Sequence, residues 1–275
     1  MPELPEVETV AQGVHDRTHG QRILSATFSR AREPFKTDPE TLSAALAGLR
    51  IARVHRVGKH IVFDLETLRG KPAPHQFLVH LGMTGRLLYS HADVPIPPHT
   101  HGRLTLSSGY ELRFVDARRF GRLGLHTVEN AQPFRGPGSE PLTISPEDFC
   151  AVFHNRKLSI KAALLNQKLL HGVGNIYADE SLFRAGIRPT RIAGSISRPR
   201  LLRLHAAIQT VLRHAIQLGG SSVSDYVDAD GVRGFFQLEH RVYDRAGEPC
   251  RDCGAEIQKI VHAGRGTHYC PKCQR

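Results

Sequence analysis

The chain has 275 residues, of which 40% are hydrophobic and 23% are charged, which excludes a wholly disordered protein and allows one large domain or two ordinary ones. Its net charge of +11 and pI of about 9.8 favour a polyanionic partner such as nucleic acid. The longest apolar runs are too short for a membrane span, and the start of the chain lacks the pattern of a signal peptide. We therefore expect a soluble, cytoplasmic protein that does not contact a membrane.

The first predicted element is a helix from about Glu6 to Val14, whose valines recur on one face. Pro5 suits the first turn of such a helix, because its missing N–H costs little there. Short strand-like runs separated by Gly, Pro and Ser follow, and this pattern predicts a β-sandwich or barrel. These runs are residues 61–65, 77–81, 104–106, 112–115 and 123–125.

The composition changes at residues 133–141, where three prolines and two glycines indicate a linker. The pattern beyond it is helical. The clearest helix runs from about Arg198 to Leu218, with apolar residues at spacings of three and four, and the pair Gly219-Gly220 ends it. The segment 219–236 is rich in Ser, Asp and Gly, and we expect a mobile loop there.

A helix, a glycine turn and a second helix are predicted at 164–170, 171–175 and 176–183. Gly172 and Gly174 would let the main chain approach a phosphate closely. Asn175 can either cap the second helix or donate a hydrogen bond to an oxygen, and the motif alone favours capping.

Four of the five cysteines form two Cys-x2-Cys pairs near the end of the chain, separated by 16 residues. This spacing predicts a closed, structural zinc site with one Zn²⁺, formed by Cys250, Cys253, Cys270 and Cys273. Its expected role is to hold the basic hairpin 262–268 in one shape. The fifth, Cys150, lies in an apolar setting that indicates a buried thiol without chemistry.

Pro2 would carry a secondary amine at the start of the chain once Met1 is removed. Such an amine can attack a sugar C1′ and form an iminium, which acidifies the C2′ proton and leads to strand cleavage. The positive end of a helix dipole disfavours the protonated amine, and Glu3 and Glu6 lie within reach for proton transfer.

Five sequence features taken together resemble the formamidopyrimidine-DNA glycosylase family from end to end. They are the start Met1-Pro2-Glu3-Leu4-Pro5-Glu6, the segments His80-Leu81-Gly82-Met83, Asp116-Ala117-Arg118-Arg119-Phe120-Gly121 and Gly174-Asn175-Ile176-Tyr177-Ala178, and the terminal cysteine pairs. Leu4 favours the oxidised-purine branch, since the related endonuclease VIII usually has a glycine at this position.

The resemblance implies an α+β multidomain fold in which DNA occupies the cleft between two halves. The expected parts are an N-terminal catalytic β-sandwich with flanking helices (1–132), the linker (133–141), a helix-two-turn-helix domain with a loop that covers the lesion (142–240), and a zinc finger (241–275). The implied activity is base-excision repair: removal of oxidised purines such as 8-oxoguanine and formamidopyrimidines from damaged double-stranded DNA, followed by β,δ-elimination. We expect a bacterial monomer that needs no nucleotide cofactor.

The resemblance also implies roles for single residues. Pro2 would be the Schiff-base nucleophile and Glu3 the general acid, with Lys59 acting on the damaged base or in β-elimination and Arg265 in phosphate binding and δ-elimination. Met83, Arg118 and Phe120 would form a wedge that fills the gap in the base stack, with Arg118 facing the orphaned cytosine. The remaining expected DNA contacts are Glu6, His80, His99, Arg156 and Asn175.

Two other functions remain open from the sequence. One is a glycosylase for oxidised pyrimidines of the endonuclease VIII type. The other is a damaged-DNA binding module without catalysis, which would be expected to have lost Pro2, Glu3 or Lys59, and all three are present.

Overall fold

The computed structural model describes residues 1–30, 34–128, 132–223 and 226–275. The chain divides into two compact units, which we call the first unit (1–135 and 219–235) and the second unit (136–218 and 236–275). The segment 219–235 thus belongs with the first unit, although residues of the second unit flank it in the sequence. Among the residues described, no helix combines the length and apolarity that a membrane crossing requires.

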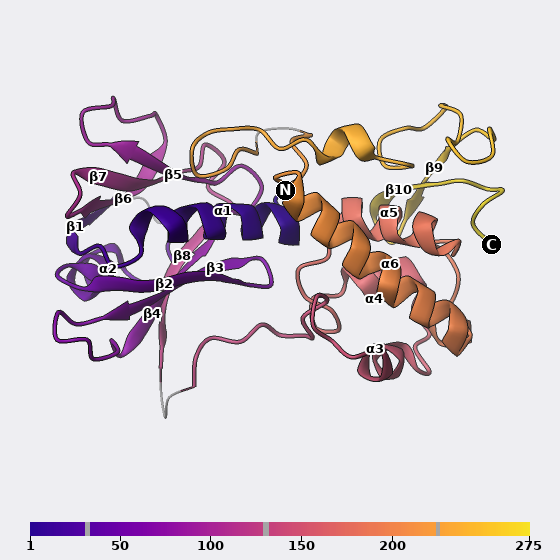
Figure 1. Ribbon diagram of the computed structural model, residues 1–275, viewed down its shortest axis with the longest axis horizontal. Coiled ribbons are helices and arrows are strands. Elements are labelled where there is room, and N and C mark those ends of the chain that lie inside the picture. Colours follow the sequence, from indigo (N-terminus) through magenta and orange to yellow (C-terminus); the bar gives the residue numbers. More distant parts are fainter. Residues whose placement is uncertain (31–33, 129–131, 224–225) are drawn as a thin grey trace. The chain divides into compact units, whose positions relative to one another are not determined.

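The first unit contains two four-stranded antiparallel sheets, in agreement with the predicted sandwich (Figure 1). The strand orders are β1-β6-β7-β5 and β2-β3-β4-β8. The strands are β1 (Ile23–Phe28), β2 (Arg50–Val57), β3 (His60–Glu66), β4 (His75–His80), β5 (Arg86–His91), β6 (Thr100–Leu106), β7 (Tyr110–Val115) and β8 (Arg122–Thr127), and the helices are α1 (Leu4–Thr18) and α2 (Pro39–Leu46).

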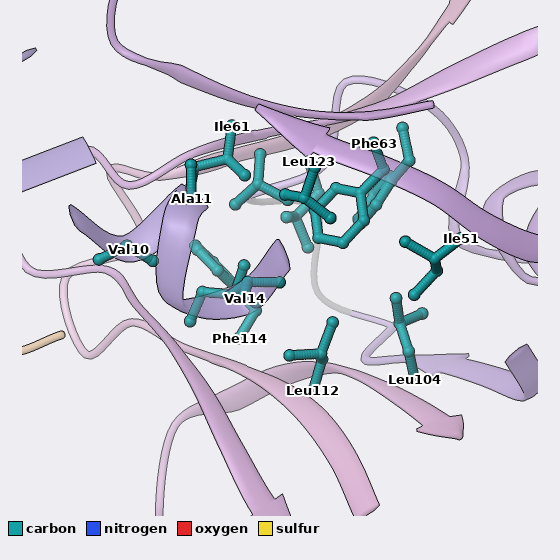
Figure 2. Packing of buried hydrophobic residues seen from close by; sticks show 14 of the residues in the cluster. Val10, Ala11, Val14, Ile51, Ile61, Phe63, Leu104, Leu112, Phe114 and Leu123 are labelled. Atoms are coloured by element: carbon teal, nitrogen blue, oxygen red, sulfur yellow. The ribbon is translucent and has the colours of Figure 1, made fainter. Parts of the chain in front are cut away.

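One hydrophobic core joins α1 to both sheets. Figure 2 shows side chains from the helix and from each sheet pointing into the same cluster. Burial of each such side chain contributes about 1.5–3 kcal/mol, so the helix is fixed mainly by its apolar face. The figure labels Val10, Ala11 and Val14 of α1, Ile51, Ile61, Phe63 and Leu123 of one sheet, and Leu104, Leu112 and Phe114 of the other.

Helix α1 extends beyond the predicted span of about 6–14 at both ends. A capping box between Glu3 and Glu6 starts it two residues earlier, and at the other end Thr18 Oγ1 donates to the Val14 carbonyl over 2.7 Å. Neither feature appears in the apolar periodicity.

The second unit is helical, with one two-stranded hairpin (Figure 1). The predicted helix at 198–218 is confirmed as α6, and the one at 176–183 as α5. The elements are α3 (Pro146–Phe153), α4 (Ile160–Leu165), α5 (Asn175–Ala185), η2 (Ala193–Ser195), α6 (Arg198–Gln217), η3 (Phe236–Glu239), β9 (Gln258–His262) and β10 (Arg265–Tyr269).

The helix predicted at 164–170 is wrong, because α4 ends at Leu165. Asn166 Oδ1 accepts the Lys168 N–H over 3.0 Å, and the Gln167 side chain donates to the carbonyls of Leu165 and Val173. These side chains compete with the helical hydrogen bonds and turn the chain instead.

The predicted linker 133–141 is irregular, but its second half is not a free spacer. Ser139 N–H donates to the Leu169 carbonyl over 3.1 Å, and the Ser139 carbonyl accepts the His171 N–H over 3.1 Å. These bonds place the chain against the second unit from Gly136 onward. The division into functional domains expected from the resemblance stays a prediction.

A fully buried ion pair crosses the second unit. Lys161 Nζ of α4 lies 2.7 Å from Asp179 Oδ1 of α5, and neither side chain is exposed. Lys161 Nζ also donates to the Gly266 carbonyl and to Thr267 Oγ1, while Asp179 Oδ2 accepts the His268 N–H over 2.9 Å. The pair therefore joins two helices to the β9–β10 hairpin.

Removing one partner of this pair leaves an uncompensated buried charge. We expect Lys161→Met to lower the free energy of unfolding of the second unit by about 3–5 kcal/mol. Lys161→Met combined with Asp179→Leu should recover only part of that loss, because the His268 N–H then lacks its acceptor. Urea unfolding measures both, and Lys157→Met, which changes an exposed lysine of the same unit, is the control. Equal stability of the Lys161 and Lys157 variants would contradict the expectation.

Candidate active site

Two buried glutamates lie at the start of α1. Glu3 and Glu6 are 3% and 2% exposed, and the Glu3 N–H donates to Glu6 Oε2 over 2.8 Å. Pro2, directly before them, is also buried. The candidate nucleophile and two carboxyl groups thus share the positive end of the helix dipole.

The other carboxylate oxygen of Glu6 binds the segment 219–235. The Ser221 N–H donates to Glu6 Oε1 over 2.7 Å, and the Tyr226 hydroxyl donates to the Glu6 carbonyl over 3.4 Å. A Cβ on Gly220 would lie 2.9 Å from Glu6 Oε1, so this approach requires glycine. Burial, and then the charge of Glu6, raise the pKa of Tyr226, which keeps its hydroxyl protonated. The Glu6 carboxylate thus binds two main-chain N–H groups, and its expected contact with DNA stays a prediction.

Lys59 lies in the two-residue turn between β2 and β3, next to the pair Val57–His60. Arg56 fixes this turn to α1. Its Nη1 donates to the Gly58 carbonyl over 3.2 Å, and its Nε donates to Glu8 Oε2 over 2.6 Å. The hairpin that carries Lys59 is therefore attached to the helix that follows Pro2.

His80 lies opposite His60 across β3 and β4, with the ring centroids 4.9 Å apart. Its Nδ1 accepts the Gly82 N–H over 3.1 Å, so the ring hydrogen is on Nε2. Burial, and then the charges of His60, Lys59 and Arg122, lower the pKa of His80 to about 4. At neutral pH this side chain is an uncharged hydrogen-bond donor.

Asp116, which is fully buried, joins the two loops that carry the candidate wedge. Its Oδ1 accepts from Thr84 Oγ1 over 2.6 Å, and its Oδ2 accepts from the Gly121 N–H over 2.7 Å. The loops touch main chain to main chain, since a Cβ on Gly82 would lie 2.4 Å from the carbonyl carbon of Phe120. The loops 82–85 and 116–121 are consequently held together as one unit, and we call this unit the support.

The wedge residues project from this support. Met83 and Phe120 are 41% and 47% exposed, as side chains that enter a base stack must be. The Arg118 guanidinium lies 4.7 Å from the centroid of the Phe120 ring. His99 is exposed, has a φ of 64°, and its carbonyl accepts the Asp116 N–H over 3.0 Å.

A cavity of about 400 Å³ adjoins the wedge within the first unit. Its arginine side chains form no ion pair with any carboxylate of the described residues. Sequence reasoning missed this cavity, because its residues come from separate segments with no common motif. The lining residues are Thr84, Arg86, Ala117, Arg118, Tyr226, Val227 and Arg233.

The second unit brings together Asn175 and the hairpin that begins with Arg265. Gly174 is the N-cap of α5, so the capping role favoured for Asn175 is wrong. Instead, Asn175 Nδ2 donates to the Gly266 carbonyl over 2.9 Å. Arg265, which is exposed, follows the turn Ala263-Gly264, where both residues have positive φ as in a type I′ hairpin turn.

Arg156 follows α3, and its Nε donates to the Val152 carbonyl over 3.1 Å. Its main chain binds Gly194, whose N–H donates to the Arg156 carbonyl over 3.0 Å. Within the ranges described, no hydrogen bond links Arg156 to Asn175 or Arg265.

The four cysteines converge as predicted, with their Sγ atoms within 4.8 Å of one another. The Cys250–Cys273 and Cys253–Cys270 sulfur distances are 3.9 and 3.5 Å. Four thiolates about 2.3 Å from a tetrahedral Zn²⁺ would be about 3.8 Å apart, so the residues fit this ion. Cys150 is buried, and burial raises the pKa of its thiol, as expected for an inert cysteine.

Three family models match the chain. The formamidopyrimidine-DNA glycosylase N-terminal domain matches residues 1–123, the formamidopyrimidine-DNA glycosylase H2TH domain matches 136–227, and a zinc finger found in FPG and IleRS matches 247–275. The four-cysteine cluster is therefore that of a zinc finger with one structural Zn²⁺.

Known proteins resemble the chain over its whole length. Formamidopyrimidine-DNA glycosylase of Solibacter usitatus is 46% identical over 100% of both chains, and that of Symbiobacterium thermophilum is 42% identical over 100% of this chain and 89% of its own. A Lactococcus lactis FPG mutant in complex with Fapy-dG DNA has a TM-score of 0.89, at 35% identity and with 100% of both chains covered. The MutM (FPG) protein of Thermus thermophilus has a TM-score of 0.85, at 39% identity over 99% of this chain and 98% of that one. By sequence and by fold, the chain belongs to the formamidopyrimidine-DNA glycosylase family.

Proposed function

We propose that this chain removes oxidised purines from duplex DNA and then cleaves the strand at the resulting abasic site. The observation that carries the proposal is the grouping of Pro2, Glu3 and Glu6 at the start of α1. Solved structures of a relative support this choice of substrate, since Lactococcus lactis Fpg structures contain Fapy-dG DNA and abasic-site DNA.

The reaction begins at the nitrogen of Pro2, which becomes a secondary amine when Met1 is removed. This nitrogen bonds to C1′ while the bond from C1′ to the base breaks, and the electron pair leaves with the base, which takes up the proton that the nitrogen releases. The nitrogen lone pair then expels O4′, which accepts a proton from Glu3, and an iminium forms. Loss of the C2′ proton expels the 3′ phosphate, and a second elimination expels the 5′ phosphate. Glu6 acts as a positioning residue.

C1′ is out of reach inside a duplex, so the damaged nucleotide must rotate out of the base stack. Met83, Arg118 and Phe120 fill the space it leaves, which offsets an unstacking cost of a few kcal/mol. The first-unit cavity receives the base, since its volume of about 400 Å³ suits a small ligand. The guanidinium groups of Arg86 and Arg233 donate to the additional carbonyl oxygens of an oxidised purine.

The remaining candidates bind the sugar-phosphate backbone. Lys59 assists base removal or β-elimination. His80, His99, Arg156 and Asn175 contact phosphates. Arg265 also contacts a phosphate and takes part in δ-elimination. Bound Zn²⁺ stabilises the two cysteine turns, and the β9–β10 hairpin between them carries Arg265.

Borohydride trapping on a duplex with 8-oxoguanine opposite cytosine tests the nucleophile. We expect the trapped adduct on Pro2, because its nitrogen is the amine placed at the helix start. Pro2→Gly should reduce both base excision and cross-linking at least tenfold, whereas the control Pro5→Ala should retain both.

An adduct mapped to Lys59 in the unaltered protein would overturn the assignment of the nucleophile. A parallel panel of lesions tests the substrate class, and a preference for oxidised pyrimidines would overturn it.

Arg118→Ala should flatten the preference for the base opposite the lesion. Arginine can donate to O2 and N3 of cytosine, whereas adenine presents a different edge, and one good polar contact discriminates by about 1–3 kcal/mol. Single-turnover excision should therefore fall about 5- to 150-fold more opposite cytosine than opposite adenine. The neighbouring variant Arg119→Gln is the control. An equal loss against both bases would make Arg118 a general DNA anchor.

His80 should make the protein less stable in acid. Its pKa of about 4 in the folded state lies below the ordinary value of 6.5, so the unfolded chain takes up the proton first as the pH falls. Stability is therefore lost between pH 6.5 and 4, by on the order of 3 kcal/mol from this residue. Urea unfolding of His80→Gln across this range should show a smaller loss than that of the exposed-histidine control His19→Gln. Identical pH profiles of the two variants would contradict this account.

A further inference from the structure

The sequence from Ser181 to Leu218 contains seven arginines and no aspartate or glutamate. This segment covers the end of α5, η2 and α6, all in the second unit. The proposed chemistry uses none of these arginines. Such an uncompensated run of one charge sign is typical of a surface that meets a polyanion.

Five arginines lie on one surface, which we call the arginine face: Arg188, Arg191, Arg200, Arg203 and Arg275. Main-chain hydrogen bonds link its parts, since the Arg188 N–H donates to the main-chain carboxylate of Arg275 and the Arg191 N–H donates to the Arg188 carbonyl. A cavity of about 360 Å³ opens here, lined by Arg188, Thr190, Arg191, Pro271, Gln274 and Arg275.

Two of these guanidinium groups are held in place. The Arg188 guanidinium lies 5.1 Å from the Tyr269 ring centroid, and its Nη2 donates to the Tyr269 hydroxyl over 3.2 Å. Arg200 Nη2 donates to the Gly186 carbonyl over 3.1 Å. Burial, and then the neighbouring charges of Arg191 and Arg203, lower the pKa of Arg200, as expected where like charges are crowded together.

No side-chain carboxylate among the described residues forms an ion pair with any member of the arginine face. Arg198, at the start of α6, illustrates the contrast, since it lies 3.5 Å from Glu147. The main-chain carboxylate of Arg275 at the chain end offsets one of these five charges, since Arg200 Nη2 donates to its oxygen over 2.5 Å. The remaining crowded arginines are unfavourable for an isolated protein, and an anion would relieve their repulsion. The planar guanidinium fork matches phosphate oxygens particularly well.

The arginine face is separate from the pair Asn175–Arg265. Tyr269, which contacts Arg188, is at the opposite end of β10 from Arg265, about 14 Å away at the rise of a strand. Asn175 begins α5, whereas Gly186 follows its last residue, about 16 Å farther along the axis. Figure 1 shows the chain end marked C beside this far end of α5.

We propose that the arginine face binds the phosphate backbone of a second DNA duplex while the protein holds its lesion duplex. An acidic peptide fits less well, because the cavity lining offers no apolar side chain besides Pro271 to anchor one. A second duplex bound here gives the enzyme a route for direct transfer between DNA segments. The proposal concerns binding only and does not depend on the chemistry at Pro2.

The test uses the full-length zinc protein saturated with a short duplex that contains a tetrahydrofuran abasic-site analogue. A labelled, undamaged duplex of the same length is then added, and its binding is followed by fluorescence anisotropy at salt concentrations from roughly 25 to 200 mM, a range over which phosphate contacts weaken measurably. The variant is Arg191→Gln with Arg203→Gln, which removes two exposed charges without touching the held side chains. Arg184→Gln with Arg251→Gln removes two exposed charges elsewhere in the same unit and is the matched control.

We expect the second duplex to bind the unaltered complex, and the face variant to reduce the slope of log K against log salt by about 2, since each lost phosphate contact removes about 0.9. The control should change the slope by less than half as much. Competitor duplex should also accelerate release of the lesion duplex from the unaltered protein but not from the face variant. Single-turnover excision on a short duplex should stay unchanged in both variants.

Three results would overturn the proposal: absence of second-duplex binding at the lowest salt concentration, equal slopes for the face variant and the control, or tighter binding of an oligoglutamate than of the duplex. Loss of excision in the unaltered protein would instead count against the proposed function, so the two failures are distinguishable.

Discussion

The carboxylate of Glu6 determines how the start of α1 and the segment 219–235 are placed in the first unit. One oxygen accepts the Glu3 N–H and the other accepts the Ser221 N–H, from residues more than 200 positions apart in sequence. A buried carboxylate is costly unless it is hydrogen-bonded, so both donors must be present together. The environment of Pro2 is consequently complete only when the later segment has docked on α1.

Buried carboxylates also fix other irregular segments of the fold. Asp116 joins the two wedge loops, and Asp179 joins α5 to the hairpin that carries Arg265. Glu180 accepts three consecutive main-chain N–H groups, from residues 241 to 243, over 2.8–2.9 Å. Each of these carboxylates is at most 3% exposed. Regular helices and strands provide the frame, and buried acids orient the loops that bear the candidate chemistry.

The sequence predicted features that depend on local pattern. The sandwich strands follow from alternation, α6 from its apolar stripe, and the metal site from cysteine spacing. Features that depend on distant pairing could not be read in this way. Apolar spacing does not show that Asn166 and Gln167 would end α4, or that Gly174 would cap α5 in place of Asn175. Nothing near Thr84 or Arg233 in the chain indicates that both line one cavity, since a fold brings them together across about 150 positions of sequence.

The division of the chain into units also constrains how the protein folds during synthesis. The chain leaves the first unit after residue 135 and returns to it for residues 219–235, and Tyr226 and Ala229 of that return segment belong to the first unit's hydrophobic core. The ribosome must therefore add about 100 further residues before this core can close, which takes about 5–20 s at ordinary translation rates. During that interval the nascent sandwich exposes apolar surface that its own later residues will cover. A chaperone that binds such surfaces would find its substrate in this window, and a premature stop between the two segments would leave an N-terminal fragment without a finished core.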